Sequence, residues 1–407
     1  MKLKNRLQTL LTMVALALSV GPAARAATKT IAPDGPRPVG ARVMHVSIAG
    51  QIRPLLVWYP ADASARGRAP ILYSTGLLGW AVADAEPDRA APPCPLIIFS
   101  HGMGGCAAQH VFINENLASF GYVVIAPDHQ EAQMCHIEGK PEIGATRLTW
   151  SVLTNRFNLS QVVFDLFGGM MKERGYDFSY RPAEIKAVID FALAQNQDPD
   201  SFLHGRIDPE KIGMAGHSLG GYTTLMVGGM PFSCGESPPP EEDCRLDHLT
   251  LDRLPNPCCF DYVRQAGPFG FRDPRVKALL VLSPAVMFPD LPRAAAELKL
   301  PIMLISGADK NFEVPWAPVQ TIYDHAPRPK YLIRLRQTDH MTAADSTLNL
   351  SLARLFLPGF RTHFADKAQA YQEYSAAFFN LHLKGEAPKD NVLIRPLNRF
   401  VEIWSDQ

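Results

Sequence analysis

A serine between two glycines, Gly216-His217-Ser218-Leu219-Gly220, is the stretch of this chain best suited to covalent chemistry. An apolar run ends just before it, and a run compatible with a helix, 222–227, follows at once. In a sharp turn between a strand and a helix, flanking glycines relieve crowding and leave the serine hydroxyl at the helix N-terminus, where negative charge is favoured. The sequence therefore predicts a nucleophile elbow at Ser218. A glycine-bounded turn whose serine only caps the helix is the alternative.

A serine hydroxyl is a poor nucleophile unless a base takes its proton and a carboxylate holds that base in the right tautomer. At an elbow of this type the chain order is serine, acid, histidine, with each residue just beyond a strand. Asp309 follows the apolar run 302–306, and His340 follows the apolar run 331–335. Order and position together predict Asp309 as the acid and His340 as the base.

Each of these two assignments has an alternative. The chain has 12 histidines, so His340 could be an ordinary loop histidine. Asp309 could be a loop aspartate that forms its own turn. Asp339 is interpreted as a flanking residue, because adjacent residues seldom face each other in the geometry that the acid and the base need.

The negative oxygen of a tetrahedral intermediate needs backbone donors that are already in place. The Leu219 N–H, directly after the predicted nucleophile, is expected to be one donor. The turn His101-Gly102-Met103 is expected to supply the other, through the Met103 N–H. His101 precedes the turn and is interpreted as a structural hydrogen-bonding residue, and His217 is too close along the chain to reach round to Ser218.

The elements that must position these residues follow from short apolar runs bounded by turn signals. Between the strands lie helical patterns, of which 181–195 is the clearest, with Pro182 in its first turn and one apolar face. Alternation of strands and helices predicts a mostly parallel sheet covered on both faces. The expected strands are 43–48, 55–59, 95–100, 122–126, 212–215, 276–282, 302–306 and 331–335.

Residues 1–26 have a basic start, an apolar stretch and small residues near Ala26, a pattern typical of a secretory signal peptide. A membrane anchor is the alternative, but the apolar run is short for a span. Residues 27–407 are expected to form a single domain. Two excursions, 143–171 and 231–272, interrupt the alternation and could cover the site, although the first could equally be a core helix.

The balance of 40 basic and 40 acidic residues gives no reason to expect nucleic acid or an anionic membrane as a partner. All seven cysteines lie beyond residue 26, and in an oxidising compartment an odd number leaves one unpaired. Cys234 with Cys244 and Cys106 with Cys135 are the pairs suggested by proximity along the chain. No C-x-x-C pair occurs, which argues against a zinc site, and the predicted serine chemistry requires neither a metal nor a cofactor.

Several of these motifs resemble those of a known superfamily. Residues 96–104, 216–221 and 273–278 resemble the α/β-hydrolases and, within them, the branch of platelet-activating-factor acetylhydrolases and predicted dienelactone hydrolases; residues 53–60 match the style of that branch. The resemblance covers roughly residues 43–385. It implies an α/β-hydrolase fold, with a mostly parallel eight-stranded sheet, helices on both faces and lid-like insertions, and it implies a serine esterase.

Two departures limit what the resemblance carries over. Dienelactone hydrolases have a cysteine nucleophile, whereas this chain has Ser218. In mammalian-type acetylhydrolases the acid follows an earlier strand, at a place matched here by Ser283 and Pro284, neither of which is a carboxylate. Asp309 therefore takes the role by the more usual superfamily position, and the substrate of that branch is not carried over.

Together these observations predict an exported serine esterase, periplasmic or extracellular, that works through an acyl-enzyme. The apolar stretch near Trp150 and Phe157 favours a small or polymeric ester with a hydrophobic portion, such as a short-chain, lipid-like or polyester substrate. An amidase or peptidase on the same triad is one alternative, and a non-catalytic binding protein of the same fold is another. The sequence predicts no stable membrane anchor, and it leaves the oligomeric state, the ester and its chain length open.

Overall fold

The structure is a computed structural model, and it describes residues 27–139, 151, 177–232, 234, 239–244, 256–307, 316–338, 340–345 and 363–407. The predicted leader, 1–26, and almost all of the first predicted excursion, 143–171, lie outside these residues. Within the described ranges, no helix combines the length and the apolar character that a membrane span requires.

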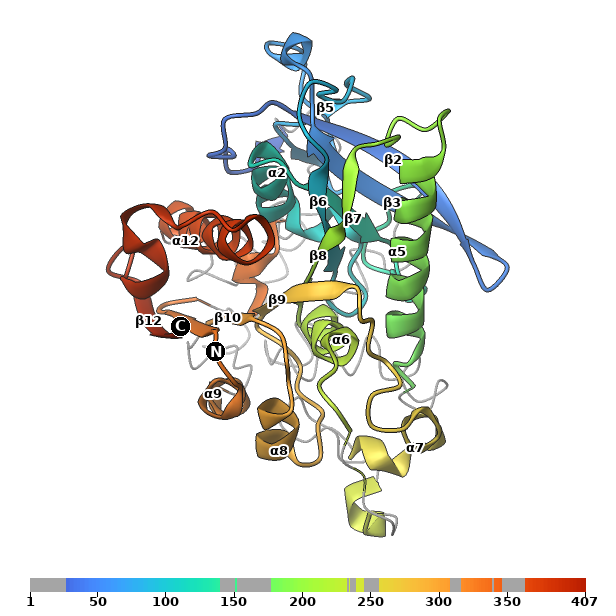
Figure 1. Cartoon of the computed structure of the whole chain (residues 1–407), viewed down its shortest axis with the longest axis vertical. Helices are drawn as coiled ribbons and strands as arrows, with labels where there is room; N and C mark the ends of the chain where they lie inside the picture. Colours follow the sequence, from blue (N-terminus) through green and yellow to red (C-terminus); the bar gives the residue numbers. More distant parts are fainter. Residues whose placement is uncertain are drawn as a thin grey trace, which may run out of the picture.

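A ten-stranded sheet runs through the described part of the molecule, in the order β12-β11-β10-β9-β8-β6-β7-β3-β2-β5 (Figure 1). Its central strands, from β11 to β7, are parallel, and antiparallel partners adjoin them on both sides. The strands are β2 (Val39–Ile48), β3 (Gln51–Pro60), β5 (Val82–Ala83), β6 (Cys94–Ser100), β7 (Val123–Pro127), β8 (Ile207–His217), β9 (Val276–Leu282), β10 (Ile302–Gly307), β11 (Lys330–Leu335) and β12 (Val401–Asp406). β1 (Thr28–Lys29) and β4 (Leu77–Leu78) form a separate two-stranded sheet.

Helices cover both faces of the sheet because successive strand residues point to opposite sides. In β6, Leu96 and Ile98 join one hydrophobic cluster, whereas Ile97 and Phe99 join the other. Side chains of α5 (Tyr180–Gln197), α6 (Leu219–Gly228), α8 (Leu291–Ala296) and α9 (Trp316–His325) belong to the first cluster, and those of α2 (Val111–Ser119) and α12 (Phe364–Phe379) belong to the second. The predicted covering of both faces is therefore confirmed (Figure 1).

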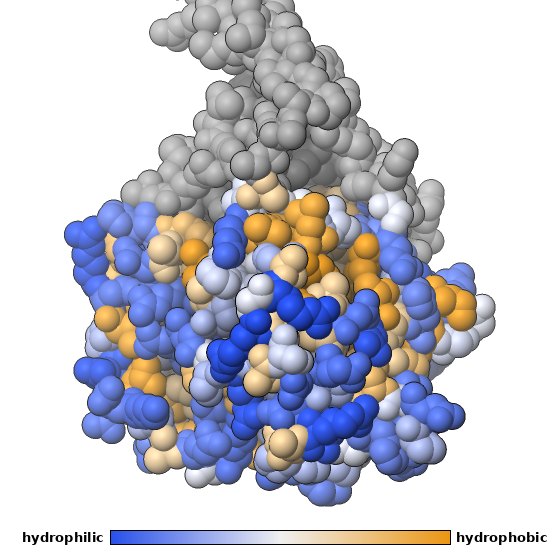
Figure 2. All heavy atoms as spheres, turned by 90° about the horizontal axis from the view of Figure 1, so that it is seen from above, coloured by the Kyte–Doolittle hydropathy of each residue, from blue (hydrophilic) through white to orange (hydrophobic). Residues whose placement is uncertain are grey.

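Shorter helical turns connect these elements. They are η1 (Ala63–Ala65), η2 (Ala107–His110), η3 (Glu241–Cys244), η4 (Pro257–Cys259), α7 (Asp261–Ala266), η5 (His340–Ala343), η7 (Asn380–Lys384) and η8 (Lys389–Ile394). Figure 2 shows that hydrophilic residues dominate one face of the molecule, with apolar residues gathered in patches between them.

The predicted number of eight strands is not confirmed, because the described residues contain ten in the main sheet. β12 was not expected; it pairs along its whole length with β11, antiparallel, from Val401 opposite Leu335 to Asp406 opposite Lys330. β5 has only two residues, which is too few for a periodic pattern. The predicted helix at 181–195 is confirmed as α5, with Ile185, Val188 and Ile189 buried.

Three disulfides join described cysteines. Cys106 pairs with Cys135 as expected, and Cys94 is free and buried. The expected pair Cys234 with Cys244 is wrong: Cys234 bonds to Cys258, and Cys244 bonds to Cys259. The adjacent residues Cys258 and Cys259 each bond to a cysteine from the earlier part of the second excursion. Proximity along the chain therefore did not indicate which cysteines are close in space.

Candidate active site

Ser218 occupies a strained turn between β8 and α6. Its backbone has φ 57° and ψ −118°, a conformation that L-residues rarely adopt. A Cβ atom on Gly216 would lie 2.2 Å from the Gly220 carbonyl oxygen, and one on Gly220 would lie 2.0 Å from the Ser100 carbonyl oxygen. Both glycines are therefore needed for the strand, the turn and the helix to pack this closely.

His340 lies against Ser218 although 122 residues separate them in the chain. It begins the turn η5, which follows β11 at the carboxyl ends of the parallel strands. Its Nε2 is 2.9 Å from the Ser218 Oγ, a hydrogen-bond distance for a hydroxyl that donates to an imidazole. The structure thus brings together the predicted nucleophile and the predicted base, and both are partly exposed.

The second ring nitrogen of His340 is buried, and no described residue forms a hydrogen bond with it. If Nε2 accepts from Ser218, then Nδ1 carries the proton and needs an acceptor. The predicted acid, Asp309, lies outside the described residues. β10 ends two residues earlier at Gly307, where an added Cβ would lie 2.4 Å from the Thr338 Oγ1, so the chain leaves β10 beside the segment that leads to His340.

His217 contacts both the backbone and the ring of His340. Its Nε2 donates to the His340 carbonyl oxygen at 2.8 Å, and the two rings lie 4.7 Å apart. Burial lowers the pKa of His217 to about 4, and burial together with His217 lowers the pKa of His340 well below its usual value. Both imidazoles are therefore neutral near pH 7, and a neutral His340 is the form that can accept a proton.

The turn after β6 lies against the predicted nucleophile. A Cβ atom on Gly102 would lie 3.4 Å from the Ser218 Cβ. The Gly102 N–H is already used, because it donates to the Gln109 Oε1 at 2.9 Å. The Met103 N–H has no acceptor among the described residues.

Leu219 is the first residue of α6, so its N–H has no intrahelical carbonyl partner. The donors expected at Met103 and Leu219 therefore lie on the turn beside Ser218 and on the residue after it. Neither N–H has an acceptor among the described residues, and two such N–H groups beside a hydroxyl are the arrangement that an oxyanion requires.

A second serine, histidine and acid lie together behind this turn, and sequence reasoning missed them. The Ser100 Oγ is 2.9 Å from the His129 Nε2, and the His129 Nδ1 is 2.6 Å from the Glu184 Oε2. Ser100 is 0%, His129 1% and Glu184 4% exposed, so no substrate can reach the hydroxyl. The Ser100 Oγ also accepts a hydrogen bond from Arg181. These three side chains are buried, whereas Ser218 and His340 are partly exposed.

Asp345 is a further missed residue, five positions after His340. It is fully buried, and its carboxylate accepts hydrogen bonds from the Val111 and Phe112 N–H groups and from the Thr30 hydroxyl. The carboxylate thus caps α2 from a distant segment and attaches the His340 turn to that helix. A single aspartate in a loop carries no sequence signal for such a contact.

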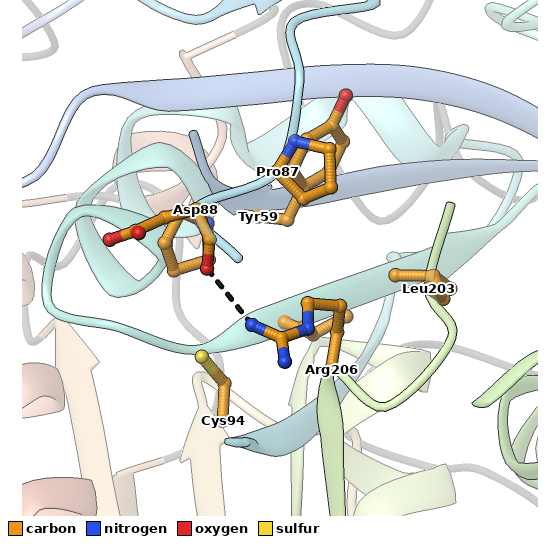
Figure 3. A pocket seen from close by; sticks show the side chains of 8 residues that line it. Tyr59, Pro87, Asp88, Cys94, Leu203 and Arg206 are labelled. Atoms are coloured by element: carbon orange, nitrogen blue, oxygen red, sulfur yellow. Dashed lines mark hydrogen bonds between the residues drawn. The ribbon is translucent and has the colours of Figure 1, made fainter. Parts of the chain in front are cut away.

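No other part of the described chain offers a comparable site. The described residues contain no group of three or more His, Cys, Asp or Glu side chains that could hold a metal ion. A pocket lined by Cys94 and Arg206, among others, has a volume of about 10 Å³, room for about one water molecule. Figure 3 shows its lining side chains. Burial raises the pKa of the Cys94 thiol, which keeps it protonated and unreactive.

Comparisons with known proteins agree with this architecture. The family described as "Platelet-activating factor acetylhydrolase, isoform II" matches residues 73–139, a segment that contains the Met103 turn but ends before Ser218. A platelet-activating factor acetylhydrolase of Canis lupus familiaris is 29% identical over 43% of this chain and 41% of its own length. That of Cavia porcellus is 24% identical over 37% of this chain and 36% of its own length. The chain thus matches well under half the length of these relatives.

The structural comparison extends over the chain. A ferulic acid esterase from Streptomyces cinnamoneus superposes with a TM-score of 0.57, covering 94% of this chain and 100% of that one at 21% identity. At that identity the likeness shows the fold alone. The fold is that of the α/β-hydrolases, and the predicted resemblance to the acetylhydrolase branch is confirmed for the matched part of the chain.

Proposed function

We propose that this protein is an exported serine hydrolase that cleaves carboxylic esters. The observation that carries the proposal is the 2.9 Å contact between the Ser218 Oγ and the His340 Nε2 at a strained turn before a helix. A surface hydroxyl gains nothing structural from such a turn, whereas a nucleophile needs both the exposure and the base.

In this mechanism His340 takes the proton of Ser218 as the hydroxyl oxygen attacks the ester carbonyl carbon. The Met103 and Leu219 N–H groups donate to the oxyanion, and Asp309 accepts from the His340 Nδ1 and stabilises the imidazolium. The tetrahedral intermediate collapses, the alcohol leaves with the proton from His340, and the acyl group stays on Ser218. Water, deprotonated by His340, then attacks the acyl-enzyme and releases the acid.

The names of the similar proteins support an ester as the substrate, since they are acetylhydrolases and a ferulic acid esterase. We propose a small or polymeric ester with a hydrophobic portion, in keeping with the apolar residues predicted near Trp150 and Phe157. Three disulfides suit a protein that functions in an oxidising compartment, which supports export.

Hydrolysis of a p-nitrophenyl ester series, from acetate to long acyl chains, tests the proposal. The protein without residues 1–26 should turn over at least one of these esters, and Ser218→Ala should abolish turnover while melting as the parent does. The acyl length with the highest kcat/KM then reports the size of the pocket. A folded parent that hydrolyses no ester would contradict the proposal and favour an amidase or a binding protein.

A further inference from the structure

Arg181 lies at the start of α5, behind the turn that carries Met103, and its role extends the proposed ester hydrolysis. Its side chain is 0% exposed, as is that of its partner Glu131. A buried ion pair costs several kcal/mol of desolvation, so it is a poor means of gaining stability. Burial disfavours the charge of Arg181, but Glu131, Tyr180 and Glu184 together outweigh this and raise the pKa of the guanidinium. Arg181 is therefore a permanent buried cation.

The guanidinium points its N–H groups at the backbone of the turn. Its Nη1 donates to the His101 carbonyl oxygen at 2.7 Å, and its Nη2 lies 3.4 Å from the Gly102 carbonyl oxygen. Nη1 also donates to the Ser100 Oγ at 3.0 Å, and Nη2 contacts Glu131. One side chain thus binds three consecutive residues of the chain and a charged partner.

These contacts fix both peptide units around Gly102. In the first unit the His101 carbonyl accepts from Arg181, and the Gly102 N–H donates to Gln109. In the second unit the Gly102 carbonyl accepts from the His101 Nδ1 at 2.6 Å, from the Gly105 N–H at 3.1 Å and from Arg181. The N–H and C=O of a trans peptide point in opposite directions. Holding the Gly102 carbonyl toward Arg181 therefore directs the Met103 N–H away from it.

Ser218 lies next to this peptide, since a Cβ atom on Gly102 would lie 3.4 Å from the Ser218 Cβ. A charged donor on the carbonyl also polarises the peptide and strengthens its N–H as a donor. We propose that Arg181, held by Glu131, is a positioning residue that aims and polarises the Met103 N–H for the oxyanion. This inference rests on the proposed function, since it assigns a supporting residue to the same reaction.

Replacement of Arg181 by lysine tests the proposal, because lysine keeps the charge beside Glu131 but loses the planar fork. We expect kcat for p-nitrophenyl acetate to fall ~10²-fold with KM nearly unchanged, since an oxyanion donor acts in the transition state. Inactivation by a fluorophosphonate, whose phosphoryl oxygen occupies the same place, should slow in parallel.

Arg206→Lys is the matched control. The Arg206 Nη1 also donates to two backbone carbonyls, those of Asp88 at 3.0 Å and Ala91 at 2.9 Å, and it lies near Cys94 (Figure 3). Cys94 begins β6, whereas the turn beside Ser218 follows the other end of that strand. Arg206→Lys should lower the melting temperature without changing kcat. A folded Arg181→Lys protein with kcat within about twofold of the parent, or with a loss in KM alone, would overturn the proposal.

Glu131→Gln carries the test if Arg181→Lys does not fold, because glutamine keeps the shape and removes the charge. Its kcat should fall ~10-fold at unchanged KM, and an unchanged kcat in the folded variant would again overturn the proposal. Ser218→Ala distinguishes failure of the proposed function from failure of the role proposed for Arg181. If that variant retains the parent's activity, the proposed function fails; if it is inactive while the Arg181 and Glu131 variants are fully active, only the role of Arg181 fails.

Discussion

The Nε2 of His340 is within hydrogen-bond distance of the Ser218 Oγ. Its Nδ1 is buried and has no hydrogen-bond partner among the described residues. The order of serine, aspartate and histidine in the chain already indicated both Ser218 and His340. The sequence could not show that His217 would support His340, because an adjacent residue on the strand end gives no signal of its own. The acid at Asp309 stays a prediction.

Replacement of Asp309 by asparagine should lower kcat by roughly 10²- to 10⁴-fold, because the amide would leave His340 in the wrong tautomer. The measurement is kcat for p-nitrophenyl acetate at pH 7.5. Asp339→Asn is the matched control and should retain most activity. The reverse result, with the loss in Asp339→Asn only, would move the acid to the neighbouring position.

The pH dependence of kcat/KM should reflect the lowered pKa of His340. A base is active when neutral, and a base with a lowered pKa is protonated only at lower pH. Activity should therefore remain at its plateau at pH 6.5 and decline only below that value. An assay of kcat/KM from pH 4.5 to 9 gives this pH profile. A fall in kcat/KM on the acid side with its midpoint above pH 7 would contradict the lowered pKa of His340.

At the scale of elements, the elbow depends on how closely α6 approaches the end of β6. The pattern of glycines indicated this turn, since a strand, a tight bend and a helix must follow one another within a few residues. The ion pair of Arg181 with Glu131 and the cap supplied by Asp345 could not be predicted. They join segments 50 and more than 230 residues apart, and nothing periodic marks such contacts.

Gly220→Ala should destabilise the fold and impair activity. The new Cβ would lie 2.0 Å from the Ser100 carbonyl oxygen, a backbone atom next to the Met103 turn. We expect a loss of about 1–3 kcal/mol or more in the free energy of unfolding, together with a lower kcat.

Gly228→Ala is the control in the same helix. Its Cβ would meet the Leu279 Cδ1 at 2.4 Å, the end of a flexible side chain that can move. Gly228→Ala should lower the free energy of unfolding by less than Gly220→Ala does, and it should leave kcat unchanged. Equal stability losses in urea unfolding of the two variants, with equal kcat, would contradict the close approach at Ser100.

For the whole molecule, hydrophobic runs were sufficient to predict a mostly parallel sheet with helices on both faces. The predicted number of strands was not confirmed because two strands were not expected. β12 returns from the C-terminal end to pair with β11, a long-range pairing that leaves no local pattern, and β5 has only two residues. The predicted disulfide of the second excursion, Cys234 with Cys244, was wrong because each cysteine bonds to a partner more distant in the chain. Local sequence determines the elements, but their partners depend on the complete fold.

Thiol counting tests the arrangement of the seven cysteines. Iodoacetamide should label no cysteine in the native protein, because the single free thiol, Cys94, is buried. Unfolding without a reductant should expose one thiol, and peptide mapping should then recover the three described pairs. A peptide linking Cys234 with Cys244 would contradict the described pairing.

Fluorophosphonate labelling followed by peptide mapping tests the central claim, the activation of Ser218 by His340, most directly. The account predicts one adduct per chain on Ser218, no adduct in Ser218→Ala, and a labelling rate at least ~10²-fold lower in His340→Ala. An adduct on another serine, or a folded and esterolytic protein that resists labelling at Ser218, would contradict it.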